Sequence, residues 1–475
     1  MCIDVLSGSR WRDGPFLPRH GEEYAPENAR YGPMTKVNEV ESTPRGFGRV
    51  REPNRLHGRS ISQFIQQELD MGRAALVLVI GFSTALLVIG SNISSVSSQG
   101  MENYMFFHSA SVAHAIAGSG INLASRSIYE DRVWRGGFAN KAFSGGAFTC
   151  TLTDLPFDRV RMTSSATYHG VTRVVSCLLQ PSSFSRYAYY STTDMSGYWI
   201  TGDTCWGPFH CNNTLNAAGT PVFMGRATCL NGLNKYDAAT HPVFKGGYDQ
   251  GINVTLPADL NPLKNAANIG GKYFTAGGKV FIEFLSNGQV SWRTGGPDDW
   301  SGGGWTVEDL TTFAPNGAIW SQNNDVRIKG VVNGRVTVGS NKDIWIDSDV
   351  VYAADPRVGP SDDLLGLVAE KKLWITDNAD NNGPGNNFTL MASVFSRTDG
   401  LWAEHYNSRG VEGKMTTVGG LIQKIGGYTG VFSGSPPVVV QGFEPGGAVY
   451  DLRLMNDAPP FFPTTGNYEV VSWFE

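Results

Sequence analysis

The chain has 475 residues, of which 58 are glycine and only 17% are charged, and its formal net charge is −5. This balance argues against a nucleic-acid partner, because binding a phosphate backbone requires clustered cations. Roughly 340 residues follow the helix-compatible stretch that ends near residue 131, which is enough for one large or two ordinary domains. Composition alone names no reaction.

The first 70 residues are rich in Arg, Pro, Gly and Glu and show no sustained periodicity, as in chains that bury no core. Met71, Gly72 and Arg73 then lie directly against an apolar run, as at the start of a membrane protein. We expect residues 1–70 to be either a disordered cytoplasmic tail or an over-extended reading frame. Mass spectrometry of the native N-terminus distinguishes the two, since peptides from 24–55 would rule out a start at Met71.

Residues 74–90 form an uncharged apolar run, close to the roughly 20 residues that span a bilayer core. Arginines are frequent before the run, whereas 91–125 contains one charged residue, Glu102. This asymmetry predicts a cytoplasmic N-terminus and a C-terminal body outside the cytoplasm. A cleaved signal segment and a buried core helix are the alternatives, but the run exceeds the usual signal length of about 7–15 residues. We expect an uncleaved anchor in the inner (cytoplasmic) membrane.

Helix-compatible sequence continues to residue 131, without proline. Small residues at Ala110, Ala113, Ala117, Gly120 and Ala124 are spaced three or four apart, which places them on one helical face. A long helix at 71–131 beneath a β-rich head resembles the plan of type IV pilin-like proteins and their accessory subunits, and 113–124 is similar to their alanine/glycine stretch. The prepilin Gly-Phe and glutamate are missing at the cytoplasmic edge, so the resemblance does not imply processing.

From residue 133 onward, short β-branched and aromatic runs alternate with Gly, Asn, Asp and Pro turns, which predicts an all-β body. We divide this body into a β-rich domain at 132–324 and a C-terminal domain at 325–475. Very short strands with polar corners and no intervening helices favour a parallel β-solenoid. Because exact repeats are not evident, a β-sandwich is the alternative.

Several segments of the body are similar to an uncharacterised family of exported bacterial envelope proteins that carry a pilin-accessory-like N-terminal helix. The segments that carry this resemblance are 207–213, 221–225, 330–338, 343–352, 362–369, 419–424, 458–463 and 472–475. The resemblance covers about 71–475. It implies an exported, β-rich envelope protein and transfers no functional residue.

Five of the six cysteines lie within 80 residues of the body, where oxidation is allowed outside the cytoplasm. Cys150 with Cys177 and Cys205 with Cys211 are candidate disulfides, which leaves Cys229 unpaired; sequence alone does not fix the pairing. A metal site built from cysteines and histidines at 205–241 lacks the Cys-x2-Cys spacing of structural zinc. We expect no metal and no cofactor.

Two loops carry other candidate chemistry. Residues 377–383 offer Asp and Asn oxygens suited to calcium, but they lack the spacing of an EF-hand, so a solvated turn is favoured. Trp292, Trp300 and Trp305 flank two aspartates, and aromatic rings beside carboxylates can bind or cleave sugars. Buried packing of these rings is the competing interpretation. Catalytic motifs of serine hydrolases, P-loop NTPases and zinc proteases are missing from the sequence.

These observations predict a membrane-anchored, exported cell-envelope protein of structural or assembly type. It contacts the membrane through 74–90 and acts as an accessory component of a pilus-like or secretion machine, with other envelope subunits as partners. We expect it not to be an enzyme. The alternative is a β-solenoid protein that binds or cleaves polysaccharide, an analogy at the level of fold.

Overall fold

The computed structural model describes residues 61–155, 158–193, 197–275, 278–297, 299–433 and 438–474. The described residues divide into two units, one ending at Ser111 and the other beginning at Val112. Residues 1–60 of the expected tail at 1–70 lie outside the described residues. Helix α1 spans Ile61–Glu130, so helical backbone begins before the expected boundary at residue 71.

The first unit consists of the N-terminal part of α1. Its side chains from residue 72 to residue 108 are exposed, and most of those between Ala74 and Gly90 are apolar. Three hydroxyls in this part bond within the helix: Thr84 Oγ1 donates to the Ile80 carbonyl (3.0 Å), Ser91 Oγ to the Val88 carbonyl (2.9 Å) and Ser111 Oγ to the Phe107 carbonyl (3.0 Å). By length and composition α1 is able to cross a membrane.

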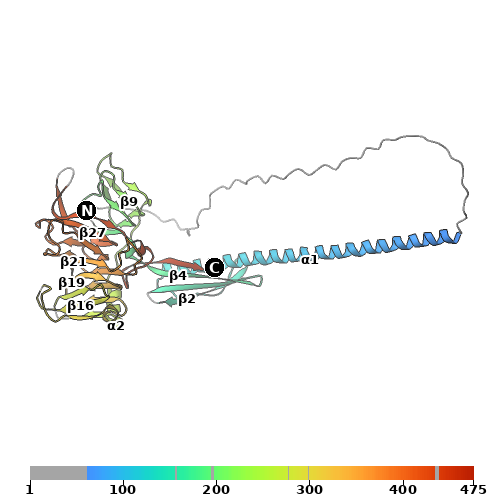
Figure 1. Cartoon of the computed structure of the whole chain (residues 1–475), viewed down its shortest axis with the longest axis horizontal. Helices are drawn as coiled ribbons and strands as arrows, with labels where there is room; N and C mark the ends of the chain where they lie inside the picture. Colours follow the sequence, from blue (N-terminus) through green and yellow to red (C-terminus); the bar gives the residue numbers. More distant parts are fainter. Residues whose placement is uncertain are drawn as a thin grey trace. The chain divides into compact units, whose positions relative to one another are not determined.

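In the second unit, the C-terminal part of α1 packs on a five-stranded antiparallel sheet. The strands, in spatial order, are β1 (Phe138–Phe143), β2 (Gly146–Leu155), β3 (Arg159–Tyr168), β4 (Val171–Ser183) and β31 (Thr464–Phe474). Ile116, Ile121 and Ile128 are buried against Phe148 and Met162. Strand β31 comes from the far end of the sequence and lies beside β4 (Figure 1).

The small residues of α1 let the helix approach this sheet closely, as their spacing predicts. Ala113, Ala117 and Ala124 have no exposed surface. A Cβ on Gly120 would lie 2.4 Å from Ser164 Oγ and 2.7 Å from the Phe148 ring, so no larger residue fits without displacing the sheet.

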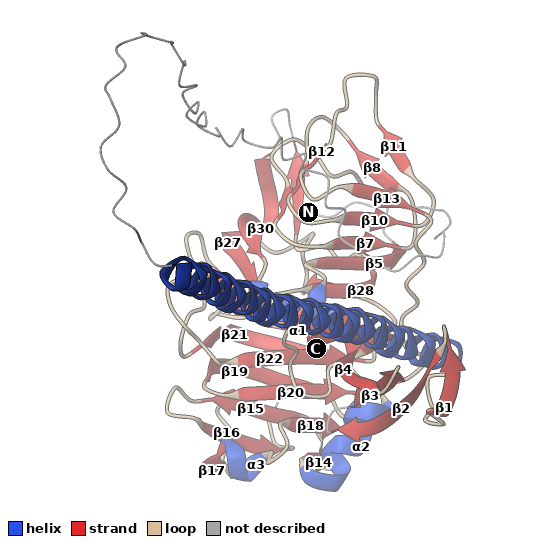
Figure 2. Cartoon of the chain, turned by 90° about the vertical axis from the view of Figure 1, so that its right-hand side faces the viewer, coloured by secondary structure: helices blue, strands red, loops and turns tan. Residues whose placement is uncertain are grey.

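Everything from residue 184 to residue 463 is inserted between β4 and β31. One sheet of this body has ten strands, all paired in parallel. In spatial order they are β13 (Tyr248–Gln250), β10 (Ala227–Cys229), β7 (Phe209–Cys211), β5 (Tyr189–Thr193), β28 (Leu421–Ile425), β25 (Ser393–Ser396), β22 (Leu364–Ala369), β20 (Arg335–Ser340), β18 (Ala318–Ser321) and β14 (Lys272–Phe274). Figure 2 shows these strands stacked one above another.

A second sheet of eleven strands is parallel in its middle and antiparallel at both ends. Its path is β17 (Thr306–Asp309), β16 (Gln289–Thr294), β15 (Val280–Phe284), β19 (Val326–Val332), β21 (Ile344–Tyr352), β24 (Phe388–Met391), β27 (Val411–Val418), β30 (Val438–Val449) and β29 (Gly430–Ser433). Off this path, β23 (Leu373–Ile375) pairs with β21 and with β26 (Leu401–Ala403). Inward residues of the two large sheets share the main apolar core.

Among the described residues, two small parallel sheets, two short helices and two 3₁₀ turns complete the body. The small sheets are β6 (Thr204–Cys205), β9 (Val222–Phe223) and β12 (Val243–Phe244), and β8 (Leu215–Ala217) with β11 (Leu233–Lys235). The short helical segments are α2 (Asn261–Gly270), α3 (Leu310–Phe313), η1 (Phe184–Arg186) and η2 (Leu452–Met455). A mainly β body after a long apolar helix is thus confirmed, with sheets that are mixed overall.

The stacking order departs from the order of the chain. Strands β5 to β13 stack upward from β28, and the chain then returns to the opposite end of the sheet to begin again at β14. The return segment is held on the outside of the stack, where the Val254 carbonyl accepts hydrogen bonds from Tyr190 Oη and Asn212 Nδ2, both 2.6 Å. The expected boundary at 324/325 falls inside sheets that continue across it, since β18 pairs with β20 and β15 with β19.

A short repeat is visible once the strands are aligned. Thr204 pairs with Val222, Phe209 with Ala227 and Leu215 with Leu233, each 18 positions apart. The repeated motif Pro-Val-Phe-x-Gly occurs at 221–225 and at 242–246.

The final glycine of this motif stacks on its predecessor. A Cβ on Gly225 would lie 2.3 Å from the Gly207 carbonyl carbon, and one on Gly246 would lie 2.3 Å from the Gly225 carbonyl carbon. Only glycine allows these corners to stack at strand spacing.

We predict that Gly225→Ala destabilises the body by about 1–3 kcal/mol, because the added methyl meets backbone that cannot rotate away. Denaturant unfolding of the full chain in micelles measures the loss. Gly359→Ala is the matched control, since a Cβ at that position meets no atom within 4 Å. Equal stability of the two variants would contradict the stacked-glycine explanation.

Candidate functional site

The exposed apolar part of α1 is one candidate functional surface. Its exposed large side chains include Leu76, Val77, Leu78, Val79, Ile80, Phe82, Leu86, Leu87, Val88 and Ile89, each more than half exposed. From residue 74 to residue 101 the helix carries no charge, a length of about 40 Å at 1.5 Å per residue, against about 30 Å for a bilayer core. All its backbone groups bond within the helix, as a lipid environment requires.

The three tryptophans singled out in the sequence do not form one cluster. Trp292 packs against Phe274 and Phe313, and its indole N–H donates to Glu308 Oε1 at 2.7 Å. Trp300 and Trp305 stack on each other, with ring centroids 5.5 Å apart and an interplanar angle of 8°.

A second row of tryptophans was missed by the sequence reasoning. Trp345, Trp374 and Trp402 occupy matching positions on β21, β23 and β26 and stand in parallel register. Trp345 and Trp374 stack at 5.5 Å, and Lys372 Nζ lies 4.7 Å from the Trp374 ring and 4.8 Å from the Trp402 ring. The recurrence of Ile/Leu-Trp-Ile/Ala at these positions was the available signal.

Trp300 and Trp374 each have both a stacked tryptophan and a lysine as neighbours. Lys329 Nζ lies 4.4 Å from the Trp300 ring, whose neighbour on the stack is Trp305, while Trp374 has Trp345 and Lys372 as neighbours. Sugar binding needs an open aromatic face, whereas mutual stacking and cation–π contacts stabilise the sheet that carries the rings. This geometry favours packing for these rings.

Asp347 organises the polar groups between the two pairs of stacked tryptophans. It is 1% exposed and accepts hydrogen bonds from Arg327 (two, both 2.6 Å), Trp300 Nε1 (2.9 Å) and Thr376 Oγ1 (2.5 Å). With these four hydrogen bonds from protein groups, the oxygens of Asp347 are used for structure.

The loop at 377–383 is held by its own hydrogen bonds. Asp377 accepts from Asn382 Nδ2 (2.6 Å) and contacts His405 Nδ1 (2.8 Å). Burial by itself would raise the pKa of Asp377, but these hydrogen bonds hold it below the ordinary value. Within the described residues, no group of three or more His, Cys, Asp or Glu side chains is placed to hold a metal.

His210, part of the metal hypothesis, is fully buried. Its ring nitrogens contact Thr228 Oγ1 (2.8 Å) and Asn212 Oδ1 (3.0 Å), and burial lowers the pKa of His210 to about 4. Both ring nitrogens are therefore hydrogen-bonded. Through Asn212, the imidazole belongs to the hydrogen-bond network that holds Val254.

The candidate disulfides are not formed in the structure. Cys150 lies on β2 and Cys177 on β4, with β3 between them, and both are buried free thiols. Cys205 is likewise a free buried thiol, so it does not pair with Cys211. Cys211 instead stands in register with Cys229 on neighbouring parallel strands.

No family model matches the chain, and no curated protein matches it. Among solved structures, the chain is similar to the competence-associated pilin ComZ from Thermus thermophilus, with 12% identity and a TM-score of 0.30. That alignment covers 77% of this chain and 97% of the pilin.

We predict that Asp347→Ala lowers the free energy of unfolding by about 3–5 kcal/mol, because it leaves the Arg327 guanidinium without its carboxylate. The exposed Asp362→Ala should change it by less than about 0.5 kcal/mol. Denaturant titration of both variants followed by tryptophan fluorescence measures the difference. Similar midpoints for the two would show that the Asp347 network contributes little.

We also predict that Cys150 and Cys177 resist thiol reagents in the folded protein. Burial raises the pKa of each thiol to about 11, so the thiolate does not form between pH 7 and 9. Maleimide labelling of native and urea-unfolded protein, with intact mass under non-reducing conditions, tests this. A native Cys150–Cys177 crosslink would contradict the structure.

Proposed function

We propose that the protein is a membrane-anchored, exported cell-envelope subunit of structural or assembly type, acting as an accessory component of a pilus-like or secretion machine. One observation carries this proposal: a single continuous helix is apolar and exposed along residues 74–90 and is packed into a protein core along 112–130. An exposed apolar helix of this length would be unstable in water. In a bilayer its apolar side chains contact lipid, and its backbone groups are hydrogen-bonded within the helix.

The packed half of the helix supports the same proposal. Its small-residue face lies against the five-stranded antiparallel sheet, so the helix belongs to the core of the head. A cleaved signal segment would have no such continuation. The helix is therefore proposed to remain attached and to hold the head at the inner membrane, with the body outside the cytoplasm as the upstream arginines indicate.

The architecture of the body is part of the proposal. We propose a parallel β-solenoid inserted into the head sheet, supported by the ten parallel strands, the 18-residue register and the stacked glycines. Anchor helix, head sheet and inserted body would then replace the two β domains expected at 132–324 and 325–475. A rigid body of this kind suits a structural subunit.

We predict that Leu78→Arg combined with Leu87→Arg releases the chain from the membrane, because each arginine at mid-bilayer costs about 2.5–3.5 kcal/mol. Cell fractionation with quantitative immunoblotting measures the membrane-bound share. Asn122→Arg is the control, since Asn122 is exposed on the same helix beyond the apolar run. Membrane retention of the double variant equal to that of the control would contradict anchoring by 74–90.

The assembly role is tested by deleting the gene in its native host. Surface filaments, secretion or adhesion should be reduced and should be restored by the wild-type chain but not by the double arginine variant. Unchanged filaments, secretion and adhesion would overturn the accessory role while leaving the membrane anchor intact.

A further inference from the structure

The stack of strands that rises from β28 ends at β11, β12 and β13, together termed the open end. Among the described residues each of the three pairs with one strand only, and Figure 2 shows β13 at the upper end of its sheet. The chain then turns back: the Gly251 and Ile252 amides donate to the Cys229 carbonyl (2.9 and 3.0 Å), and the Val254 amide to Asn212 Oδ1 (3.0 Å). The described part of the chain therefore adds no further strand here.

The hydrogen-bond pattern shows which main-chain groups at the open end are unused. In a parallel sheet, successive residues of a strand point their N–H and C=O groups alternately to the two neighbouring strands. On either side of β11, the Gly232 carbonyl and the Tyr236 amide bond to β8, at 2.8 and 2.9 Å. The groups of Leu233 and Lys235 therefore point the other way, and within the described residues nothing bonds to them. The outer edge of β11 is thus free to accept a strand.

The last apolar layer of this stack is only partly covered. In the layer beneath, Leu215 and Phe223 have no exposed surface. Leu233 and Phe244 lie directly over them in register but are only half-buried. A strand added to β11 would cover Leu233 as β11 covers Leu215, so apolar surface that is buried lower in the stack is available to a partner here.

A row of amide side chains also ends at β11. Asn234 Nδ2 donates to Asn216 Oδ1 on β8 at 2.6 Å, and the Asn234 side chain is exposed. Asparagines stacked along neighbouring strands form hydrogen-bonded ladders that each further strand can extend. An asparagine opposite Asn234 on an added parallel strand would continue this ladder.

The charges at the open end indicate the third feature of the partner. Lys235 is exposed and, within the described residues, forms no ion pair. The nearby acids are engaged, Asp249 with Arg226 (2.6 Å) and Asp237 with Thr240 Oγ1 (2.7 Å). A lysine on an edge strand disfavours pairing with an edge that offers no acid, and a second copy of this end offers no free carboxylate. A partner strand with its own carboxylate removes this obstacle.

We propose that the open end binds an extended segment of a partner protein, which adds a parallel strand to β11 with the pattern apolar, asparagine, acidic. The apolar residue covers Leu233, the asparagine extends the ladder from Asn234, and the carboxylate pairs with Lys235. The proposal is independent of the membrane anchor, because it concerns the body alone.

The test measures the binding of fluorescent heptapeptides to the full chain in micelles by fluorescence anisotropy. The first peptide is Val-Thr-Leu-Asn-Asp-Thr-Val, and the others replace its Asp by Thr or Lys, or its Asn by Thr. We expect the first peptide to bind most tightly, about threefold more tightly than the peptide with Thr in place of Asp. The peptide with Lys should bind most weakly, because it places two cations side by side.

Two substitutions at one position separate the main-chain contact from the charge. Lys235→Ala keeps the outward amide, so it should bind the Asp and Thr peptides equally well. Lys235→Pro also removes that amide, which costs the fold no hydrogen bond, and should weaken every peptide by about tenfold or more. Lys245→Ala is the control, because it removes an exposed lysine of the open end outside β11, and it should match wild type. Denaturation midpoints of all variants confirm folding.

Three results would each overturn the proposal. The first is that no peptide binds the wild-type chain. The second is equal peptide affinity of wild type and folded Lys235→Pro. The third is a wild-type dimer, detected by light scattering, that Lys235→Pro dissociates, because the open end would then bind a second copy of this chain.

Discussion

The close contact between the second half of α1 and the five-stranded sheet is the interaction on which the rest of the structure depends. At Gly120 the helix approaches Ser164 and Phe148 so closely that no side chain fits between them. The same sheet receives both ends of the inserted body through β4 and β31. A helix that is apolar and exposed in its first half is thus continuous with the core that organises the head.

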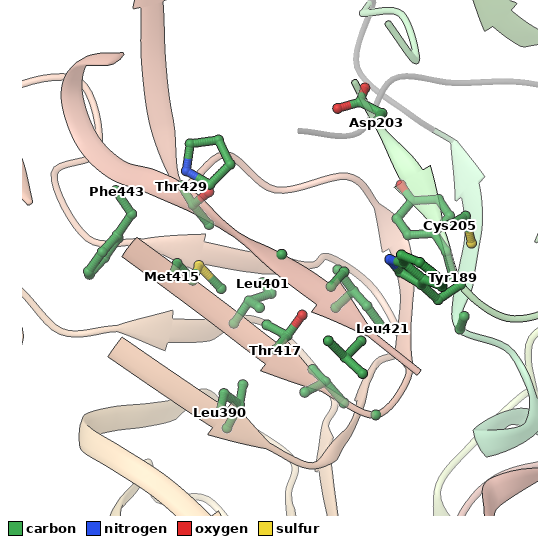
Figure 3. A pocket seen from close by; sticks show the side chains of 18 of the residues that line it. Tyr189, Asp203, Cys205, Leu390, Leu401, Met415, Thr417, Leu421, Thr429 and Phe443 are labelled. Carbon is green, nitrogen blue, oxygen red and sulfur yellow. The ribbon is translucent and has the colours of Figure 1, made fainter. Parts of the chain in front are cut away.

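The strands of the body are not stacked in the order in which they occur along the chain. The chain enters at η1, stacks β5 to β13 away from β28, and then returns along the outside to stack β14 to β28 toward β5. Two stacks distant in sequence meet at Leu421 and Tyr189 to form one parallel sheet. Leu421 and Tyr189 also line a cavity of about 460 Å³ at this junction (Figure 3).

Much of this could be predicted from the sequence, because it depends on local patterns. The apolar run, the small-residue face of α1 and the short β-branched strands all follow from residue type and spacing. The repeated motif Pro-Val-Phe-x-Gly can also be recognised in the sequence. Its 18-residue period is hidden because the repeat that ends at Val243 is three residues longer than the one before it.

What could not be predicted depends on contacts between distant segments. No local sequence pattern shows that β28 pairs with β5. The boundary expected at 324/325 and the candidate disulfides therefore could not be compared with the actual pairing of the strands. The tryptophans 292, 300 and 305 were read as one site because they are close in sequence. In the structure, the Trp300 indole N–H instead donates a hydrogen bond to Asp347, 47 positions away in the sequence.

The most direct test of the account is the membrane topology of the full chain. Single-cysteine variants at Arg73 and Gly359, made in a background in which the native cysteines are serine, are probed in spheroplasts with a membrane-impermeant maleimide. The account predicts labelling at residue 359 without permeabilisation and labelling at residue 73 only after it. Labelling of both positions, of residue 73 alone, or recovery of the chain in the soluble fraction would contradict a helix-anchored head outside the cytoplasm.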